Sequence, residues 1–83
     1  LVNEVVAAEE LDAAVERWVE QILACAPTSV RAVKQMVSRT SHLTAQEARA
    51  MRLPALMAAL DSEDSVEGVA AFQEKRKPVW PGR

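Results

Sequence analysis

Three residues near the end of the sequence have types and a spacing suited to ligand binding. Gly68, Phe72 and Lys75 follow one another at about one helical turn, so a helix through this segment places them on one side. A glycine within a helix costs roughly 1 kcal/mol relative to alanine, which favours a close approach of another group to the backbone at Gly68. We predict that these three residues form the edge of a site for an anionic, partly aromatic ligand. The alternative is that Phe72 packs on another helix and that Lys75 is solvated.

Other side chains that could do chemistry lack suitable neighbours. Cys25 is the only cysteine and His42 the only histidine, so one chain cannot form a disulfide or a histidine/cysteine metal cluster. His42 falls in a polar connection, which is typical of an exposed histidine rather than of a base. The basic run 75–77 is better explained as compensation of a helix C-terminal dipole than as a phosphate site. We predict no catalytic residue and no metal ligand in this chain.

Four helices are expected to position these residues. Apolar residues recur at helical spacing from Glu9 to Cys25, and Pro27 prevents that helix from continuing. Pro27 also suits the first turn of a second helix, which should end near Arg39. The polar segment 40–42 then connects to the third helix.

A capping-box pattern predicts the start of the third helix. Glu47 stands three residues after Thr44, so its side chain can reach back to the cap residue. The apolar positions continue to Leu60. Pro54 lies inside this pattern, and we expect it to kink the helix or to end its first part near Leu53.

The fourth helix has the clearest predicted ends. Residues 61–64 supply a cap and first-turn carboxylates, and residues 75–77 supply a basic last turn before Pro78 stops the helix. The tail 79–83 contains too much proline and glycine for regular structure, although Trp80 is expected to dock on the rest of the chain. The predicted fold class is therefore all-α, a small four-helix segment.

Size and charge predict a segment that needs a partner surface. A chain of 83 residues with 49% hydrophobic content buries only roughly 60% of its unfolded surface, and no disulfide supports it. We expect the missing stability to come from another domain or subunit. The net charge of -2 does not attract nucleic acid or an anionic membrane, and no apolar run approaches the roughly 20 residues that cross a bilayer. We predict no nucleic-acid or membrane partner and a cytoplasmic location.

Several motifs follow one another along the whole chain. They are Leu1-Val2-Asn3-Glu4-Val5-Val6, then Ala26-Pro27-Thr28-Ser29 with Val33-Lys34, then Ser62-Glu63-Asp64 through Glu67-Gly68, and then Ala71-Phe72-Gln73-Glu74-Lys75-Arg76-Lys77-Pro78. In this order they resemble the C-terminal third of the crotonase (enoyl-CoA hydratase/isomerase) family, and the block 63–78 is the most specific part. Two departures are Pro54, in a family helix that is usually continuous, and Ala7-Ala8, where a proline is common.

The resemblance implies a larger parent enzyme that hydrates a trans-2-enoyl-CoA to a 3-hydroxyacyl-CoA in fatty-acid oxidation. The catalytic groups of that family belong to a preceding β-β-α spiral core, so the 83-residue chain alone is expected to be inactive. Residues 1–8 would be the linker or strand remnant that leaves this core. Residues 9–83 would be a C-terminal helical oligomerisation domain of a trimer or a dimer of trimers. The opening without methionine fits a piece of a longer chain.

The resemblance also gives Phe72 and Lys75 a role. They match an aromatic residue and a lysine that the last helix of the family often contributes to the coenzyme A pocket, frequently that of a neighbouring subunit. The expected ligand is an acyl-CoA thioester, with coenzyme A as part of the substrate and no separate cofactor. Residues that form catalytic groups are not expected among these 83.

Three other interpretations compete with this one. The chain could be a stand-alone helical interaction module, or the tail of an isomerase or hydrolase of the same family. A helix-turn-helix nucleic-acid binder needs a basic recognition helix; Arg31, Lys34 and Arg39 occur in the second helix, but the mixed apolar face and acidic chain argue against it. The enzyme-segment hypothesis predicts that the isolated helices expose a broad apolar face.

Overall fold

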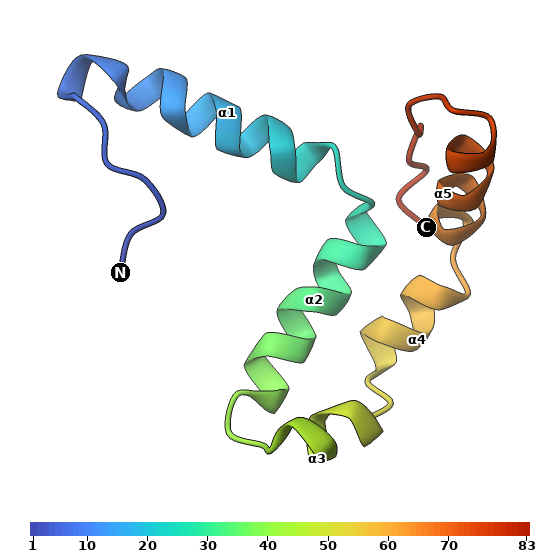
Figure 1. Ribbon diagram of the computed structural model, residues 1–83. Helices are drawn as coiled ribbons and strands as arrows, with labels where there is room; N and C mark the ends of the chain where they lie inside the picture. Colours follow the sequence, from blue (N-terminus) through green and yellow to red (C-terminus); the bar gives the residue numbers. More distant parts are fainter.

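The computed structural model describes residues 1–83 and contains helices without strands (Figure 1). In chain order the helices are the short 3-10 helix η1 (Ala8–Glu10), α1 (Leu11–Leu23), α2 (Pro27–Thr40), α3 (Ala45–Ala50), α4 (Pro54–Leu60) and α5 (Glu63–Gln73). The predicted all-α class is confirmed. There are five α-helices instead of four, because the expected third helix is divided into α3 and α4.

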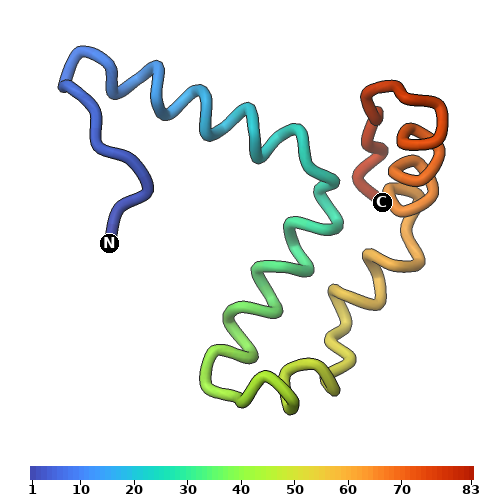
Figure 2. Tube along the Cα trace, in the orientation of Figure 1, coloured from blue at the N-terminus to red at the C-terminus, as the bar shows by residue number.

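The helices form an open arrangement rather than a closed bundle (Figures 1 and 2), and it is flat, with extents of 44 × 38 × 18 Å. α2 and α4 pack along each other, α5 follows α4, and α1 extends away from them. The radius of gyration of the Cα atoms is 16.0 Å, whereas a compact domain of this length has a radius of gyration of about 12 Å. Most helices therefore keep one side uncovered.

Little apolar surface is buried within the chain. The buried hydrophobic residues are mostly small: Ala14, Ala26, Ala32, Leu53 and Ala71. The large apolar side chains of α1 are exposed, from 40% for Trp18 to 73% for Leu23. The prediction of a broad apolar face is confirmed. A continuous apolar surface of this kind is typical of a region that packs on another protein surface.

Prolines and a capping box define the predicted helix starts. Pro27 and Pro54 occupy the first turns of α2 and α4. An N–H group at this position has no acceptor within the helix, so proline, which lacks the N–H, loses no hydrogen bond there. At the start of α3, the Glu47 N–H donates to Thr44 Oγ1 at 3.3 Å and the Thr44 N–H donates to the Glu47 carboxylate at 2.8 Å. Pro54 begins a new helix rather than bending an existing one, and α3 already ends at Ala50.

Residues 1–7 run without regular structure and are tied to α1 by one carboxylate. Glu4 accepts hydrogen bonds from Arg17 Nη2 at 2.6 Å and from Trp18 Nε1 at 2.8 Å. The same segment and the apolar side of α1 together line an open hollow. That residues 1–8 lead out of a preceding core stays a prediction.

Candidate ligand-binding groove

An open groove of about 560 Å³ lies where the start of α2, α5 and the C-terminal tail meet. Its lining residues are Ala26, Ser29, Asp64, Ser65, Gly68, Val69, Phe72, Gln73 and Trp80. The groove thus combines an apolar side with hydroxyl and carboxylate groups. Two of the three residues singled out from the sequence, Gly68 and Phe72, are in it.

Phe72 projects from α5 into solvent. Its side chain is 86% exposed, although it is the only phenylalanine of the chain. The alternative that Phe72 packs on another helix of this chain is wrong. An exposed ring beside a groove can instead stack on a planar group of a ligand or pack on a second protein surface.

Lys75 does not stand on the helical face that the sequence predicted. α5 ends at Gln73, and Lys75 has a φ of 55°, in the left-handed region. The Lys75 N–H donates to the Phe72 carbonyl at 3.3 Å and the Arg76 N–H donates to the Ala71 carbonyl at 3.0 Å. These two bonds form a Schellman motif, with Lys75 in the position that glycine usually takes.

The predicted basic last turn is therefore wrong, because the basic run follows the helix instead of ending it. The reason is local: the Schellman bonds reverse the chain at Lys75, so residues 76 and 77 leave the helix axis. Lys75 still lies close to Phe72 in the chain, at the end of the groove-lining helix. Its role toward a ligand stays a prediction.

The group that approaches the backbone at Gly68 is the indole of Trp80. A Cβ added at Gly68 would lie 3.4 Å from two ring carbons of Trp80. The close approach expected from the sequence is confirmed, but its source is the chain's own tail rather than a ligand. Trp80 Nε1 also donates to the Ala24 carbonyl at 2.9 Å, which confirms that Trp80 docks on the chain.

Asp64 connects three segments at the floor of the groove. Its side chain is buried, with 2% exposure of the residue, and accepts hydrogen bonds from two elements. Oδ2 accepts the Thr28 Oγ1–H at 2.7 Å and the Thr28 N–H at 3.2 Å, and Oδ1 accepts the Gly82 N–H at 2.7 Å. The sequence indicated Asp64 only as a helix-start carboxylate and did not predict this role.

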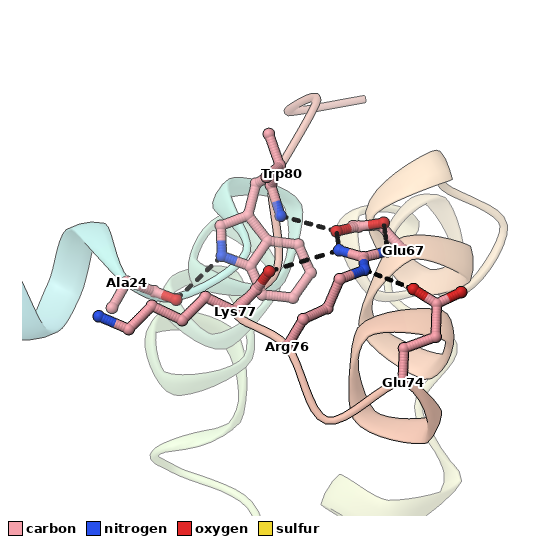
Figure 3. A network of polar contacts seen from close by, with 7 residues as sticks. Ala24, Glu67, Glu74, Arg76, Lys77 and Trp80 are labelled. Carbon is pink, nitrogen blue, oxygen red and sulfur yellow. Dashed lines mark hydrogen bonds and ion pairs between the residues drawn. The ribbon is translucent and has the colours of Figure 1, made fainter.

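Glu67 holds the first part of the tail (Figure 3). Its carboxylate forms a two-pronged ion pair with Arg76, at 2.5 Å to Nη1 and 2.9 Å to Nη2, and also accepts the Val79 N–H at 2.7 Å. Arg76 Nε donates to Glu74 at 2.6 Å. A paired, two-pronged geometry is the strongest form of such an ion pair.

These contacts shift the pKa values of both acids downwards. Burial raises the pKa of Asp64, but hydrogen bonds from the Thr28 hydroxyl and from the Gly82 and Thr28 amides, helped by the Arg31 charge, lower it below its usual range. Hydrogen bonds from Arg76 and from the Val79 amide lower the pKa of Glu67 to about 2. Both groups are thus charged anchors of the tail near neutral pH, not proton donors.

Other candidate residues lie apart from the groove. Cys25 is exposed, and its Sγ donates to the Gln21 carbonyl. His42 lies near Arg39 and Met51 on the other end of α2. The structure brings together no group of three His, Cys, Asp or Glu side chains that could hold a metal ion. None of the helices has the length and apolar character to cross a membrane.

Comparison with known proteins defines the class. A family profile described as Enoyl-CoA hydratase/isomerase matches residues 1–83. The chain is 38% identical over 87 residues to carnitinyl-CoA dehydratase of Escherichia coli (strain K12), covering 100% of this chain and 33% of that protein. The chain belongs to the enoyl-CoA hydratase/isomerase family, also called the crotonase family.

Solved structures agree with this assignment. A protein described as a short chain enoyl-CoA hydratase from Novosphingobium aromaticivorans matches with a TM-score of 0.90 and 35% identity, over 99% of this chain and 32% of that chain. An enoyl-CoA hydratase from Bacillus anthracis matches with a TM-score of 0.84 and 28% identity, over 95% and 31%. The chain corresponds to the C-terminal helical part of this fold, and it spans about a third of the length of the curated relatives it matches.

Proposed function

We propose that the chain is the C-terminal part of an enoyl-CoA hydratase that hydrates a trans-2-enoyl-CoA to a 3-hydroxyacyl-CoA. The activities named for its relatives support this choice. A dehydratase acting on carnitinyl-CoA and a hydratase acting on an enoyl-CoA run the same chemistry in opposite directions, which is the exchange of water across a carbon–carbon double bond of a CoA thioester. Isomerisation of the double bond is the second candidate, because the family description includes it.

The groove beside Phe72 is the observation that carries the proposed role. It offers an 86% exposed aromatic ring and polar groups, but its one carboxylate, Asp64, already accepts hydrogen bonds from Thr28 and from the Gly82 N–H of the tail. A ring suited to stacking, followed by Lys75, fits the nucleotide end of coenzyme A better than the reacting acyl group. This chain would therefore contribute to binding, while the catalytic groups come from a preceding core.

The exposed apolar faces fit the second part of the proposal. Residues 9–83 would form a helical oligomerisation domain that packs on the core and on sister subunits, in a trimer or a dimer of trimers. The apolar side chains of α1 and those of α2, such as Val33 and Val37, remain uncovered within the chain. Residues 1–8 would connect to the core, and the enzyme would act in fatty-acid oxidation in the cytoplasm.

The decisive experiment measures the complete protein that carries this chain. Purified enzyme is mixed with a short trans-2-enoyl-CoA, and loss of the conjugated double bond and formation of the 3-hydroxyacyl-CoA are followed. We expect hydration by the complete protein and none by residues 1–83 alone. Formation of a 3-enoyl-CoA without a hydroxylated product would favour the isomerase, and no reaction with any CoA ester would favour the stand-alone interaction module.

The binding role is tested by Phe72→Ala and Lys75→Ala in the same protein. Lys75→Ala should weaken CoA-ester binding by about 1 kcal/mol, the size of a partly exposed charge contact. Val66→Ala is a matched control, because Val66 is also an exposed apolar residue of α5 but does not line the groove. Unchanged affinity in Phe72→Ala would remove this groove from the coenzyme A site, and unchanged affinity in Lys75→Ala would remove Lys75 from it.

A further inference from the structure

We propose that Trp80 is a positioning residue that locks the α1–α2 junction onto α5 and thereby forms one wall of the groove beside Phe72. The effect on ligand binding rests on the proposed function. The lock itself is defined by contacts within the chain, so the two parts can be tested separately.

The tail is anchored on both sides of Trp80. Before it, Arg76 and the Val79 N–H bind the Glu67 carboxylate, at distances of 2.5 to 2.9 Å. After it, the Gly82 N–H donates to Asp64 at 2.7 Å. Glu67 and Asp64 stand about one turn apart on α5, so these bonds fix the tail along that helix. They thereby hold the indole at a fixed position along the helix axis.

The indole then connects two elements that are far apart in sequence. Its outer ring carbons would be 3.4 Å from a Cβ at Gly68, so the ring lies against the backbone of α5. On its other edge, Nε1 donates to the Ala24 carbonyl, which belongs to the C-terminal cap of α1. Figure 3 shows the indole pointing at Ala24 while the Glu67–Arg76 pair holds the tail beside it.

Within this chain, few other contacts fix the angle between α1 and the remaining helices. α1 packs on η1 but makes no extensive contact with α2, α4 or α5, and it extends away from them (Figure 2). Residues 24–26 between α1 and α2 are therefore a hinge whose angle is set by few contacts. Because last-turn carbonyls of a helix have no intrahelical donor, an indole N–H at Ala24 satisfies a free acceptor and restrains the hinge.

The same hinge residue helps to line the groove. Ala26 and Trp80 both face it together with Gly68 and Phe72. Loss of the indole would open the groove wall next to Phe72 and release α1 at the same time. Trp80 would then affect binding of the ligand without touching its reacting atoms.

The test uses Trp80→Phe and Trp80→Ala in the complete protein, with Val79→Ala as matched control. Trp80→Phe keeps an aromatic ring but removes the N–H donor, and it covers the case in which Trp80→Ala fails to fold. Val79 precedes Trp80 and its side chain is 77% exposed, while its anchoring N–H survives the substitution. Amide hydrogen exchange and steady-state kinetics with an enoyl-CoA ester are measured for all variants.

We expect the amides of Ala24, Cys25 and Val30 to exchange roughly two- to tenfold faster in both Trp80 variants, the range for one lost hydrogen bond. In Trp80→Ala we expect KM to rise roughly three- to tenfold while kcat stays within about twofold, because binding and not the chemical step is affected. Val79→Ala should change neither measurement.

Each of the other outcomes contradicts one part of the proposal. Unchanged exchange at the hinge in both variants overturns the lock. Faster exchange with unchanged KM overturns the role of Trp80 in the groove, although the hydratase proposal stands. If the wild-type protein binds no CoA ester, the proposed function fails, and the exchange data alone decide whether Trp80 locks the hinge.

Discussion

Asp64 caps α2 from another helix: its Oδ2 accepts both the Thr28 N–H, at 3.2 Å, and the Thr28 hydroxyl, at 2.7 Å. The residue in the N-cap position of α2 is Ala26, whose side chain has no acceptor. A carboxylate from the first turn of α5 therefore replaces the missing local cap. It also complements the positive end of the α2 dipole.

The first prediction concerns this cap. Thr28→Val keeps the shape of the side chain but removes the hydroxyl donor to a buried carboxylate, so we expect a loss of about 1.5–3 kcal/mol in unfolding free energy. Thr40→Val is the control, because Thr40 donates at the same 2.7 Å to the Met36 carbonyl, but this hydrogen bond is exposed and its acceptor is uncharged. Denaturant unfolding of the two variants checks the difference, and equal losses would show that Asp64 is not the important acceptor.

The second prediction concerns acid stability through Glu67. Its pKa falls from 4.5 to about 2 in the folded protein, so the folded state binds its proton less readily than the unfolded state. The stabilisation is therefore fully present above pH 4.5 and is lost as the pH falls through about 2. The Glu67→Gln variant should be less stable than the wild type at neutral pH. Its free energy of unfolding should also fall less as the pH is lowered from 4.5 to about 2. If the free energy of unfolding of the variant falls with pH in parallel with that of the wild type, the prediction is wrong.

The third prediction separates helix propensity from packing at Gly68. A Cβ there meets Trp80 at an ordinary contact distance of 3.4 Å. We expect Gly68→Ala to stabilise the protein by about 0.5–1 kcal/mol, because alanine favours the helix without moving the indole. Gly68→Leu extends further and should displace the ring and lower the melting temperature. Thermal unfolding of both variants checks this; a destabilised alanine variant would show that the indole packs more tightly.

The fourth prediction separates charge from conformation at Lys75. Its φ of 55° favours glycine, so Lys75→Gly should stabilise the helix end by about 1 kcal/mol, whereas Lys75→Ala keeps the strain. If the ammonium group contacts the ligand, both variants should weaken binding of a CoA ester equally. Calorimetric titration measures the affinities. Weakening in the glycine variant alone would assign the effect to the backbone turn instead of the charge.

The fifth prediction concerns the apolar face of α1. Val19 and Ile22 are 46% and 55% exposed, and no other helix of the chain covers them. Residues 1–83 alone should therefore self-associate at micromolar concentration, and Val19→Glu with Ile22→Glu should reduce this. Glu16→Gln is a control on the charged side of the same helix. Sedimentation velocity measures the association, and a monomeric wild-type chain would contradict the prediction.

The sequence by itself determined the helices and most of their starts. Pro27 and the Thr44–Glu47 capping box act within one turn of chain, so their effect does not depend on distant partners. The motif block 63–78 was enough to indicate the family. The exposed apolar faces also followed from the sequence, because 83 residues with such amphipathic helices lack the surface to cover them.

Only the tertiary structure decided what the charged residues and Trp80 do. Asp64 and Glu67 looked like ordinary helix-face carboxylates, and their partners, Thr28 and Val79, are 36 and 12 residues away. The end of α5 was predicted too late because a left-handed residue other than glycine leaves little signal in sequence. Contacts between distant segments depend on how the chain turns in space, and here the tail's return placed an indole where the glycine suggested a ligand.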